Sequence, residues 1–227
     1  MESKRRRAPA KPSAPKRPKT KKAPAPRTRG EGKQQILAAA LKLFADANYD
    51  AVSTADIAKE AGTSQSVVLY HFGTKLDLWR EAMRLLFQRI GVDARFESEA
   101  YKDLDPLARL RVLLRSFVLT SARHPELGRV IFQEGSMGGE RFDWLMEELG
   151  RSNYAVFERL FEEAIKKKLI KPYPPAMLTI LAHGAAATFF NLSAVTRVLI
   201  KDDPFSQKMV EQQADLTVDV LINGLKN

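Results

Sequence analysis

The sequence predicts an all-α protein of about nine helices, and three observations support this prediction. From Lys33 to the C-terminus, apolar residues recur every three or four positions, which is the period of one face of a helix. No segment alternates apolar and polar residues in the way that a half-buried strand does. Helix-start patterns, in which Ser, Thr or Asp is followed by an acid three residues later or directly by Pro, recur between the apolar stretches.

Residues 1–30 differ in composition from the rest of the chain. They are rich in Lys, Arg, Pro and Ala and contain no large apolar side chain after Met1. Twelve of the 37 Lys and Arg residues lie in residues 1–29 against one acid, Glu2, so the net charge of +10 belongs to this segment. Since nothing in it offsets the entropy of ordering it, we predict a disordered basic arm. Such an arm can bind DNA electrostatically, and the alternative is an extension that only improves solubility.

Composition excludes several classes of site. The chain has no Cys, so it contains no disulfide, no thiolate zinc site and no cysteine nucleophile. No apolar run approaches the length of a membrane span, about eighteen residues. Ala and Pro follow the basic N-terminus at the place where a signal peptide has an apolar block. We therefore expect a cytoplasmic protein with no membrane contact, no metal and no cofactor.

The first predicted helix begins near Lys33 and ends before the segment ANYDAVS. Its apolar stripe has the spacing of one helix face and consists of Ile36, Leu37, Ala40, Leu41 and Phe44. Ser53 and Asp56 match a capping box, in which each side chain bonds the other residue's backbone N–H. This box predicts a short second helix that ends near Ala61.

The next two helices follow directly. Gly62 marks a turn after the second helix, and Ser64 is the expected cap of a short third helix that Gly73 ends. Thr74 and Asp77 repeat the capping pattern and predict a longer fourth helix.

Five further helices are predicted in the second half of the chain. Asp105 followed by Pro106 is a start signal for the first of them, and we expect the long third one to bend near Gly150. The predicted segments are residues 106–123, 126–135 and 139–170, a helix that begins at Pro174–Pro175 and continues through LAHGAAATFFNLSAV, and residues 206–224.

The second and third helices, residues 53–61 and 64–72, match a helix-turn-helix. In this motif the second helix lies in the major groove of DNA, and its N-terminal residues approach the base edges. We expect Val68 and Phe72 to face the other helices. The residues expected on or near the outward surface are Thr63, Gln65, Ser66, Val67, Tyr70 and His71.

These outward residues have side chains that suit DNA. Gln65 can pair with adenine through two hydrogen bonds, a serine can address several bases, and Val67 can touch a thymine methyl group. Tyr70 can donate to a phosphate, as can the backbone N–H groups at the start of the next helix beside Lys75. A catalytic role for His71 is not expected, because no acid, Ser or metal-ligand partner lies at a recognised spacing.

Three motifs in this region resemble the DNA-binding half of TetR-family transcriptional repressors. They are the alanine-rich first helix that ends in Phe44, the sequence TADIAKEAG from Thr54 to Gly62, and YHFGTK from Tyr70 to Lys75. The similarity extends over about residues 32–83, and the lengths of the later helices are also similar to those of the family.

The resemblance implies roles for individual residues. It implies that Thr54 touches a phosphate and that residues 63–67, Ser64 included, read the sequence. It also implies that Tyr70, His71 and Lys75 contact the DNA backbone or groove. Gln65 and Ser66 stand where the family often has Lys and Gly, and Leu69 stands where it often has Tyr. The operator therefore does not follow from the resemblance.

The resemblance further implies a DNA-binding domain of residues 31–78 and a helical ligand-binding and dimerisation domain of residues 79–227. The small residues of LAHGAAATFF and the last helix would form a two-fold interface, for which the alternative is ordinary internal packing. His183 is either a hydrogen-bonded core residue or a polar group that faces a ligand. The candidate ligand-binding residues are Phe117, Phe132, Met137, Trp144, His183, Phe189 and Asn191.

We therefore predict a ligand-responsive, sequence-specific DNA-binding regulator of transcription. It would be a homodimeric repressor that a small molecule releases from its operator on double-stranded DNA. The aromatic candidates favour an apolar effector, whose identity the sequence does not indicate. The alternative is an architectural, nucleoid-type protein that uses the basic arm to bind DNA with little sequence specificity. No constellation of residues supports an enzyme.

Overall fold

The computed structural model describes residues 29–93, 101 and 103–226, and every regular element among them is a helix. One isolated backbone bridge, between Ile170 and Lys226, is the only β-type pairing in these residues. The all-α fold class is confirmed. The predicted basic arm, residues 1–30, lies outside the described residues except for its last two positions.

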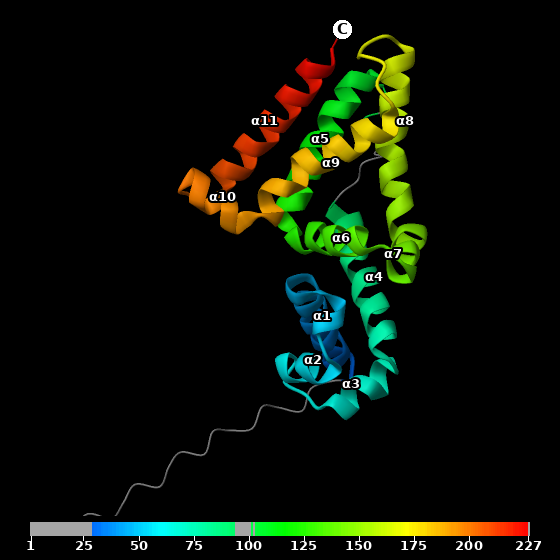
Figure 1. Cartoon of the computed structure of the whole chain (residues 1–227), viewed down its shortest axis with the longest axis vertical. Coiled ribbons are helices and arrows are strands. Elements are labelled where there is room, and N and C mark those ends of the chain that lie inside the picture. The colour runs from blue at the N-terminus through cyan, green and yellow to red at the C-terminus, as the bar shows by residue number, and fades with distance from the viewer. Residues whose placement is uncertain (1–28, 94–100, 102, 227) are drawn as a thin grey trace, which may run out of the picture.

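The first four helices pack into an N-terminal bundle, which we call the head. They are α1 (Arg29–Ala51), α2 (Thr54–Glu60), α3 (Gln65–Phe72) and α4 (Lys75–Asp93). The head occupies one end of the molecule (Figure 1). Its core is formed by the predicted apolar faces and includes Ile36, Ala40, Phe44, Ile57, Val68, Trp79 and Met83.

Local sequence signals begin and end the helices of the head. The N–H of Ser53 donates to the Asp56 carboxylate (3.0 Å) and the N–H of Asp56 donates to Ser53 Oγ (3.1 Å), which confirms the capping box. α1 breaks at Asn48, where φ is 63°, within the segment predicted to end it. Ser64 precedes α3 but does not cap it with its side chain, because its hydroxyl pairs with the Ser66 hydroxyl (2.9 Å) instead.

The later helices form a second unit, which we call the body. Its centre is α5 (Pro106–Arg123), which contacts α8 (Arg151–Lys166), α9 (Pro175–Asn191) and α11 (Gln207–Leu225). Figure 1 shows α9 crossing α5 between α8 and α11. The core of the body includes Leu110, Leu114, Phe157, Phe161, Ala182 and Ile222.

The helix count exceeds the predicted nine, since the described residues contain eleven α-helices and a π-helical turn. The predicted helix 139–170 is divided into α7 (Glu140–Leu145), the π-helical turn η2 (Met146–Gly150) and α8, so the predicted bend near Gly150 is an interruption. The next predicted helix is divided at Leu192 into α9 and α10 (Ser193–Ile200). Apolar spacing continues across both breaks and therefore does not reveal them. Among the described helices, none alone is long and apolar enough to span a membrane, although α9 and α10, bent by 76°, pass that test as a pair.

α6 (Pro125–Met137) lies between the body and the head, where it contacts both α9 and α1. Val130 of α6 and Leu145 of α7 are buried in the core of the head. Arg129 of α6 pairs with Asp46 of α1 at 3.1 Å. The head is therefore packed against the body as well as connected to it by the chain.

Candidate nucleic-acid interface

One face of α3 packs against the other helices of the head, and the opposite face is exposed. The turn before it is made at Gly62, whose φ of 63° is readily adopted by a residue without a Cβ atom. Val68 and Phe72 point inward, with exposed fractions of 1% and 8%, as predicted. Val67 and Tyr70 are 38% and 69% exposed, so apolar and aromatic surface is available on the outer face.

The residues predicted to read sequence gather at the N-terminal end of this open face. Ser64, Gln65 and Ser66 are exposed and Thr63 is half-buried. The side chain of Gln65 makes a contact that its sequence spacing does not reveal: its Nε2 donates to Oγ1 of Thr54 at 2.8 Å. The first residues of α2 and α3 are thereby joined.

Tyr70, His71 and Lys75 occupy different positions around the end of α3. The Tyr70 ring meets the His71 ring edge-on, with 5.4 Å between their centroids. His71 lines a groove of about 610 Å³ between α1 and α4, together with Lys33. Lys75 Nζ lies 4.2 Å from the centroid of the Tyr49 ring, a cation–π contact at the start of α4. Tyr70 is the most exposed of the three.

The helix-turn-helix itself carries little positive charge. Residues 53–73 contain one Lys, Lys59, against Asp56 and Glu60. Hydrogen bonds from Ser53 lower the pKa of Asp56 below its ordinary value, so this carboxyl stays ionised. Cations that attract phosphates must therefore come from the flanking helices or from the basic arm.

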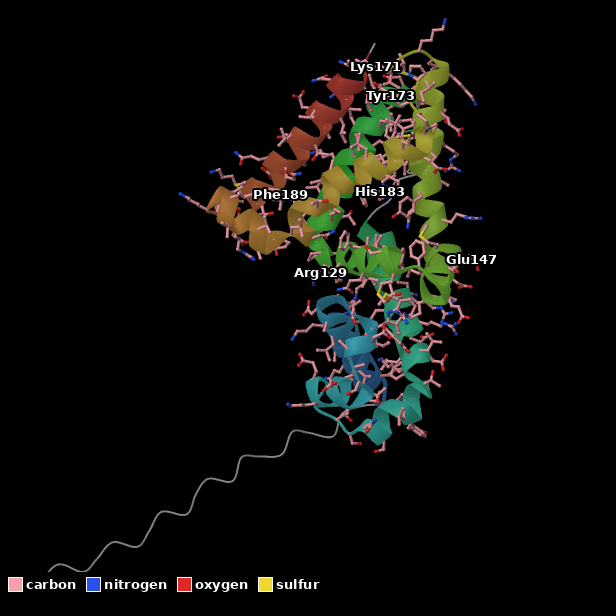
Figure 2. All side chains as sticks on the ribbon, viewed as in Figure 1. Arg129, Glu147, Lys171, Tyr173, His183 and Phe189 are labelled. Atoms are coloured by element: carbon pink, nitrogen blue, oxygen red, sulfur yellow. The ribbon has the colours of Figure 1, made fainter. Side chains whose placement is uncertain are left out.

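In the body, His183 lies midway along α9 (Figure 2). Three aromatic rings enclose its imidazole. Tyr154 stacks on the imidazole at 4.4 Å between centroids, and Phe117 and Phe157 lie at 4.5 Å and 4.8 Å. Nδ1 donates to the carbonyl oxygen of Thr179 (2.8 Å), which leaves Nε2 as an acceptor. Burial lowers the pKa of His183 to about 4, so the ring is uncharged at neutral pH.

This aromatic cluster unites two of the predicted ligand residues, Phe117 and His183, with two that the sequence analysis missed. Tyr154 and Phe157 are three residues apart and therefore share one face of α8. Their spacing is a usable signal, but it is the same signal that an ordinary core helix gives.

The other predicted ligand residues are dispersed over the body. Phe132 and Met137 of α6 are 71% and 65% exposed. Trp144 packs on α4 of the head, and Phe189 packs in a separate cluster near the end of α9 (Figure 2). Asn191 lies against the backbone of α6. The structure therefore does not bring these five residues to the cluster around His183.

A polar cluster at the junction contacts the body and the head at once. Arg141 of α7 donates to Glu134 of α6 (3.1 Å) and to Asp50 of α1 (3.4 Å). Its guanidinium carbon also lies 4.3 Å from the centroid of the Tyr49 ring. Glu134 is only 3% exposed, and this burial raises its pKa while the charge of Arg141 opposes the rise.

α9 and α11 expose an apolar surface on the body. Met177, Ile180 and Leu181 of α9 are 68%, 65% and 53% exposed, and Leu216 and Val220 of α11 are 58% and 59% exposed. Residues three or four positions apart lie on one helix face, so each helix presents a stripe. Exposed apolar surface of this kind is typical of a protein–protein contact.

Comparison with known proteins identifies the family. The model of a family described as bacterial regulatory proteins, tetR family, matches residues 36–82, which form most of the head. The HTH-type transcriptional regulator AcrR of Shigella flexneri is 30% identical over 145 residues, which cover 62% of this chain and 67% of AcrR. The chain belongs to the TetR family.

Solved structures extend the similarity of this TetR-family chain to the body. HlyIIR, a hemolysin II transcriptional regulator, matches 88% of this chain and 99% of its own with a TM-score of 0.69 at 20% identity. AibR, solved in complex with isovaleryl coenzyme A and operator DNA, matches 84% of this chain and 98% of its own with a TM-score of 0.67 at 20% identity. The fold is thus shared over nearly the whole chain. This TetR-family protein is a DNA-binding regulator of transcription, and the relatives named here are regulators.

Proposed function

We propose that this TetR-family regulator is a homodimeric repressor that binds a two-fold symmetric operator and leaves it when a small molecule binds in the body. The observation that carries the proposal is the open face of α3, which keeps polar side chains exposed beside a buried apolar face. The proposed DNA contacts are Thr54, Thr63, Ser64, Gln65, Ser66, Val67, Tyr70, His71 and Lys75.

A dimer is required on physical grounds. One short recognition helix reads too few base pairs to be selective, and a symmetric pair reads two half-sites at a fixed separation. The apolar stripes of α9 and α11 supply surface for such a pairing, which would bury side chains such as Ile180 and Leu216. We propose that these two helices form the interface.

The body is the proposed effector-binding unit. AibR combines operator DNA with isovaleryl coenzyme A on this fold, which supports a ligand and DNA as joint partners here. In this chain the cluster around His183 offers aromatic surface and an uncharged nitrogen acceptor, which suit an apolar effector better than an anion. We assign residues 31–78 to DNA binding and 79–227 to effector binding and dimerisation, with α4 crossing the boundary.

Release follows if the effector binds more tightly to a state with a different separation of the two α3 helices. α4, α6 and α7 contact both units, so a shift of any of these helices changes that separation. The effector can weaken operator binding only by the ratio of its affinities for the two states.

The test is selection of bound fragments from random DNA by the purified full-length protein. The proposal expects a two-fold symmetric consensus whose half-sites are about one helical turn apart. Fragments without any shared sequence would contradict it and would favour an architectural protein. A screen for compounds that release the selected DNA then identifies the effector.

The basic arm is proposed to supply the cations that the helix-turn-helix lacks. Deleting residues 2–28 should lower affinity for all DNA and flatten the salt dependence, whose log–log slope is about −0.9 per neutralised phosphate. A matched variant keeps the arm's length and replaces each of its Lys and Arg residues with Gln. If both variants still select the consensus, sequence reading belongs to the head. If both bind consensus and random DNA equally, the architectural alternative holds.

A further inference from the structure

The hydrogen bond between Thr54 and Gln65 has consequences for how the regulator reads a base. Thr54 is the first residue of α2 and Gln65 is the first residue of α3, yet Gln65 Nε2 donates to Thr54 Oγ1 at 2.8 Å. The Gln65 side chain is exposed and long, so without this contact it would have many orientations. The contact with Thr54 selects one of these orientations.

The groups that remain available after this bond match the edge of adenine. The amide of Gln65 has two N–H donors and one carbonyl acceptor, and only one N–H is used by Thr54. The second N–H can donate to adenine N7, and the carbonyl oxygen can accept from the adenine N6 amino group. Pairing with Thr54 therefore leaves both halves of a bidentate adenine contact in place.

The hydroxyl of Thr54 can also set which way the amide points. Its oxygen accepts from Gln65, so its own proton is free to donate to a phosphate oxygen. When a phosphate oxygen accepts a hydrogen bond from this hydroxyl, the Thr54 oxygen can only accept from Gln65. The opposite amide orientation, with the Gln65 oxygen towards Thr54, then has no hydrogen bond to Thr54. Contact with the DNA backbone thereby fixes the orientation in which the amide meets the base.

We propose that Thr54 is a positioning residue that sets the base preference of this regulator by orienting Gln65. The inference rests on the proposed function, because it requires α3 to enter the major groove. It goes beyond a phosphate contact at Thr54, since such a contact alone strengthens binding to every sequence equally.

Two neighbouring interactions make this proposal testable. The capping box that starts α2 uses Ser53 and Asp56, so the Thr54 hydroxyl can be removed without removing the cap. Ser64 and Ser66 pair with each other, at 2.9 Å between their hydroxyl oxygens. Ser66→Ala is therefore a control that alters the same surface without breaking the bond between Thr54 and Gln65.

The experiment measures binding of full-length protein to its selected operator and to operators with each half-site base pair substituted in turn. The proteins are the wild type, Thr54→Val, Thr54→Ser, Gln65→Ala, the Thr54→Val/Gln65→Ala double variant and Ser66→Ala. Circular dichroism spectra confirm that each variant keeps its helices. Thr54→Val keeps the shape of the side chain and lacks the hydroxyl, whereas Thr54→Ser keeps the hydroxyl.

We expect Gln65→Ala to lose a preference of about tenfold or more for adenine at one half-site position, within the range of a good bidentate contact. Thr54→Val should lose most of the same preference at the same position, Thr54→Ser should retain it, and the double variant should lose no more than Gln65→Ala alone. Ser66→Ala should keep the preference at that position.

The inference is overturned if Thr54→Val weakens binding equally to all operators and keeps the preference that Gln65→Ala loses. Loss of the preference in Thr54→Ser as well as in Thr54→Val would also overturn it, because the hydroxyl would not be the determinant. If the wild type itself had no preferred sequence, the proposed function would fail, and that result is distinct from either of these.

Discussion

His183 is a base held in surroundings that disfavour its charged form. Its ring lies among three aromatic rings, and its pKa falls from 6.5 to about 4. The cause is burial, which the hydrogen bond to Thr179 only partly offsets. Between these two pKa values the unfolded chain binds a proton that the folded protein does not bind, so stability must fall as the pH is lowered through this range.

We predict that His183→Gln removes this part of the pH dependence. An amide can replace the hydrogen bond to the Thr179 carbonyl and does not titrate in this range. Between pH 7 and pH 4.5 the wild type should lose roughly 2–3 kcal/mol more stability than the variant. Urea unfolding of both proteins at the two pH values measures the difference. Equal losses would show that His183 is protonated in the folded protein.

At the scale of helices, the junction between α1, α6 and α7 depends on Arg141. This side chain compensates Glu134, which is 3% exposed, and reaches Asp50 and Tyr49 of the head. The ion pair of Arg141 and Glu134 therefore packs between the body and the head. Without the guanidinium, the buried carboxylate would lack its compensating charge.

We predict that Arg141→Gln lowers the free energy of unfolding by roughly 2 kcal/mol at pH 7, because it leaves the Glu134 carboxylate buried without a cation. Adding Glu134→Gln should recover most of the loss. The loss should also shrink as the pH falls, since the pKa of Glu134, already raised by burial, rises further without Arg141 and the carboxyl becomes neutral.

Arg129→Gln is the matched control for this prediction. The Arg129 pair with Asp46 joins the same units, but the two side chains are 32% and 50% exposed. Loss of this ion pair should lower the free energy of unfolding by less than about 1 kcal/mol. Chemical denaturation of the four proteins over a range of pH compares them. Equal costs for the two arginines would indicate that burial of Glu134 is not the deciding factor.

The contact of α6 with the end of α9 depends on a missing side chain. A Cβ atom on Gly128 would overlap Oδ1 of Asn191, so the Asn191 amide occupies the space that a larger residue would need. The Asn191 amide therefore lies directly against Gly128 where α6 and α9 meet.

We predict that the effect of Gly128→Ala changes sign with the residue at position 191. In the wild type it should cost about 1 kcal/mol, because the Asn191 side chain is displaced. In an Asn191→Ala background it should stabilise by up to about 1 kcal/mol, because alanine is favoured over glycine inside a helix. Thermal unfolding of the two single variants and the double variant measures the coupling. If Gly128→Ala changed the stability equally in both backgrounds, α6 and α9 would be able to move apart enough to accommodate the added methyl group.

At the scale of the whole molecule, the proposed function gives the head and the body separate tasks, which a two-fold symmetric dimer would combine. The head presents α3 at one end of the molecule (Figure 1). The body carries the apolar stripes of α9 and α11. Pairing through the body would hold two copies of α3 at a fixed distance. In the proposed dimer, affinity for a symmetric operator would therefore depend on residues that never touch DNA.

We predict that Ile180→Asp makes the protein monomeric and lowers operator affinity by at least about tenfold, because a charge is placed in an apolar interface. Ser152→Asp adds the same charge on the exposed side of α8 and should leave both properties unchanged. Sedimentation measures the oligomeric state, and operator titration measures the affinity. A dimeric Ile180→Asp variant would assign the interface to another surface.

Local sequence patterns are sufficient to predict the all-α class, the head helices and the inward face of α3. These features depend on local signals: apolar residues with the period of a helix, capping pairs such as Ser53 with Asp56, and a glycine at the turn. The motif match to the TetR family covers the same local region. Each signal spans only a few residues, so it can be recognised from residues that are close together in the chain.

The contacts between residues that are distant in the chain become known from the packing of whole helices. The bond between Thr54 and Gln65 and the rings around His183 each join different helices. The breaks in two predicted helices likewise leave their apolar spacing intact. Apolar spacing states which face of a helix is buried, but the identity of the side chain opposite depends on how whole helices cross, and no short stretch of sequence contains that information.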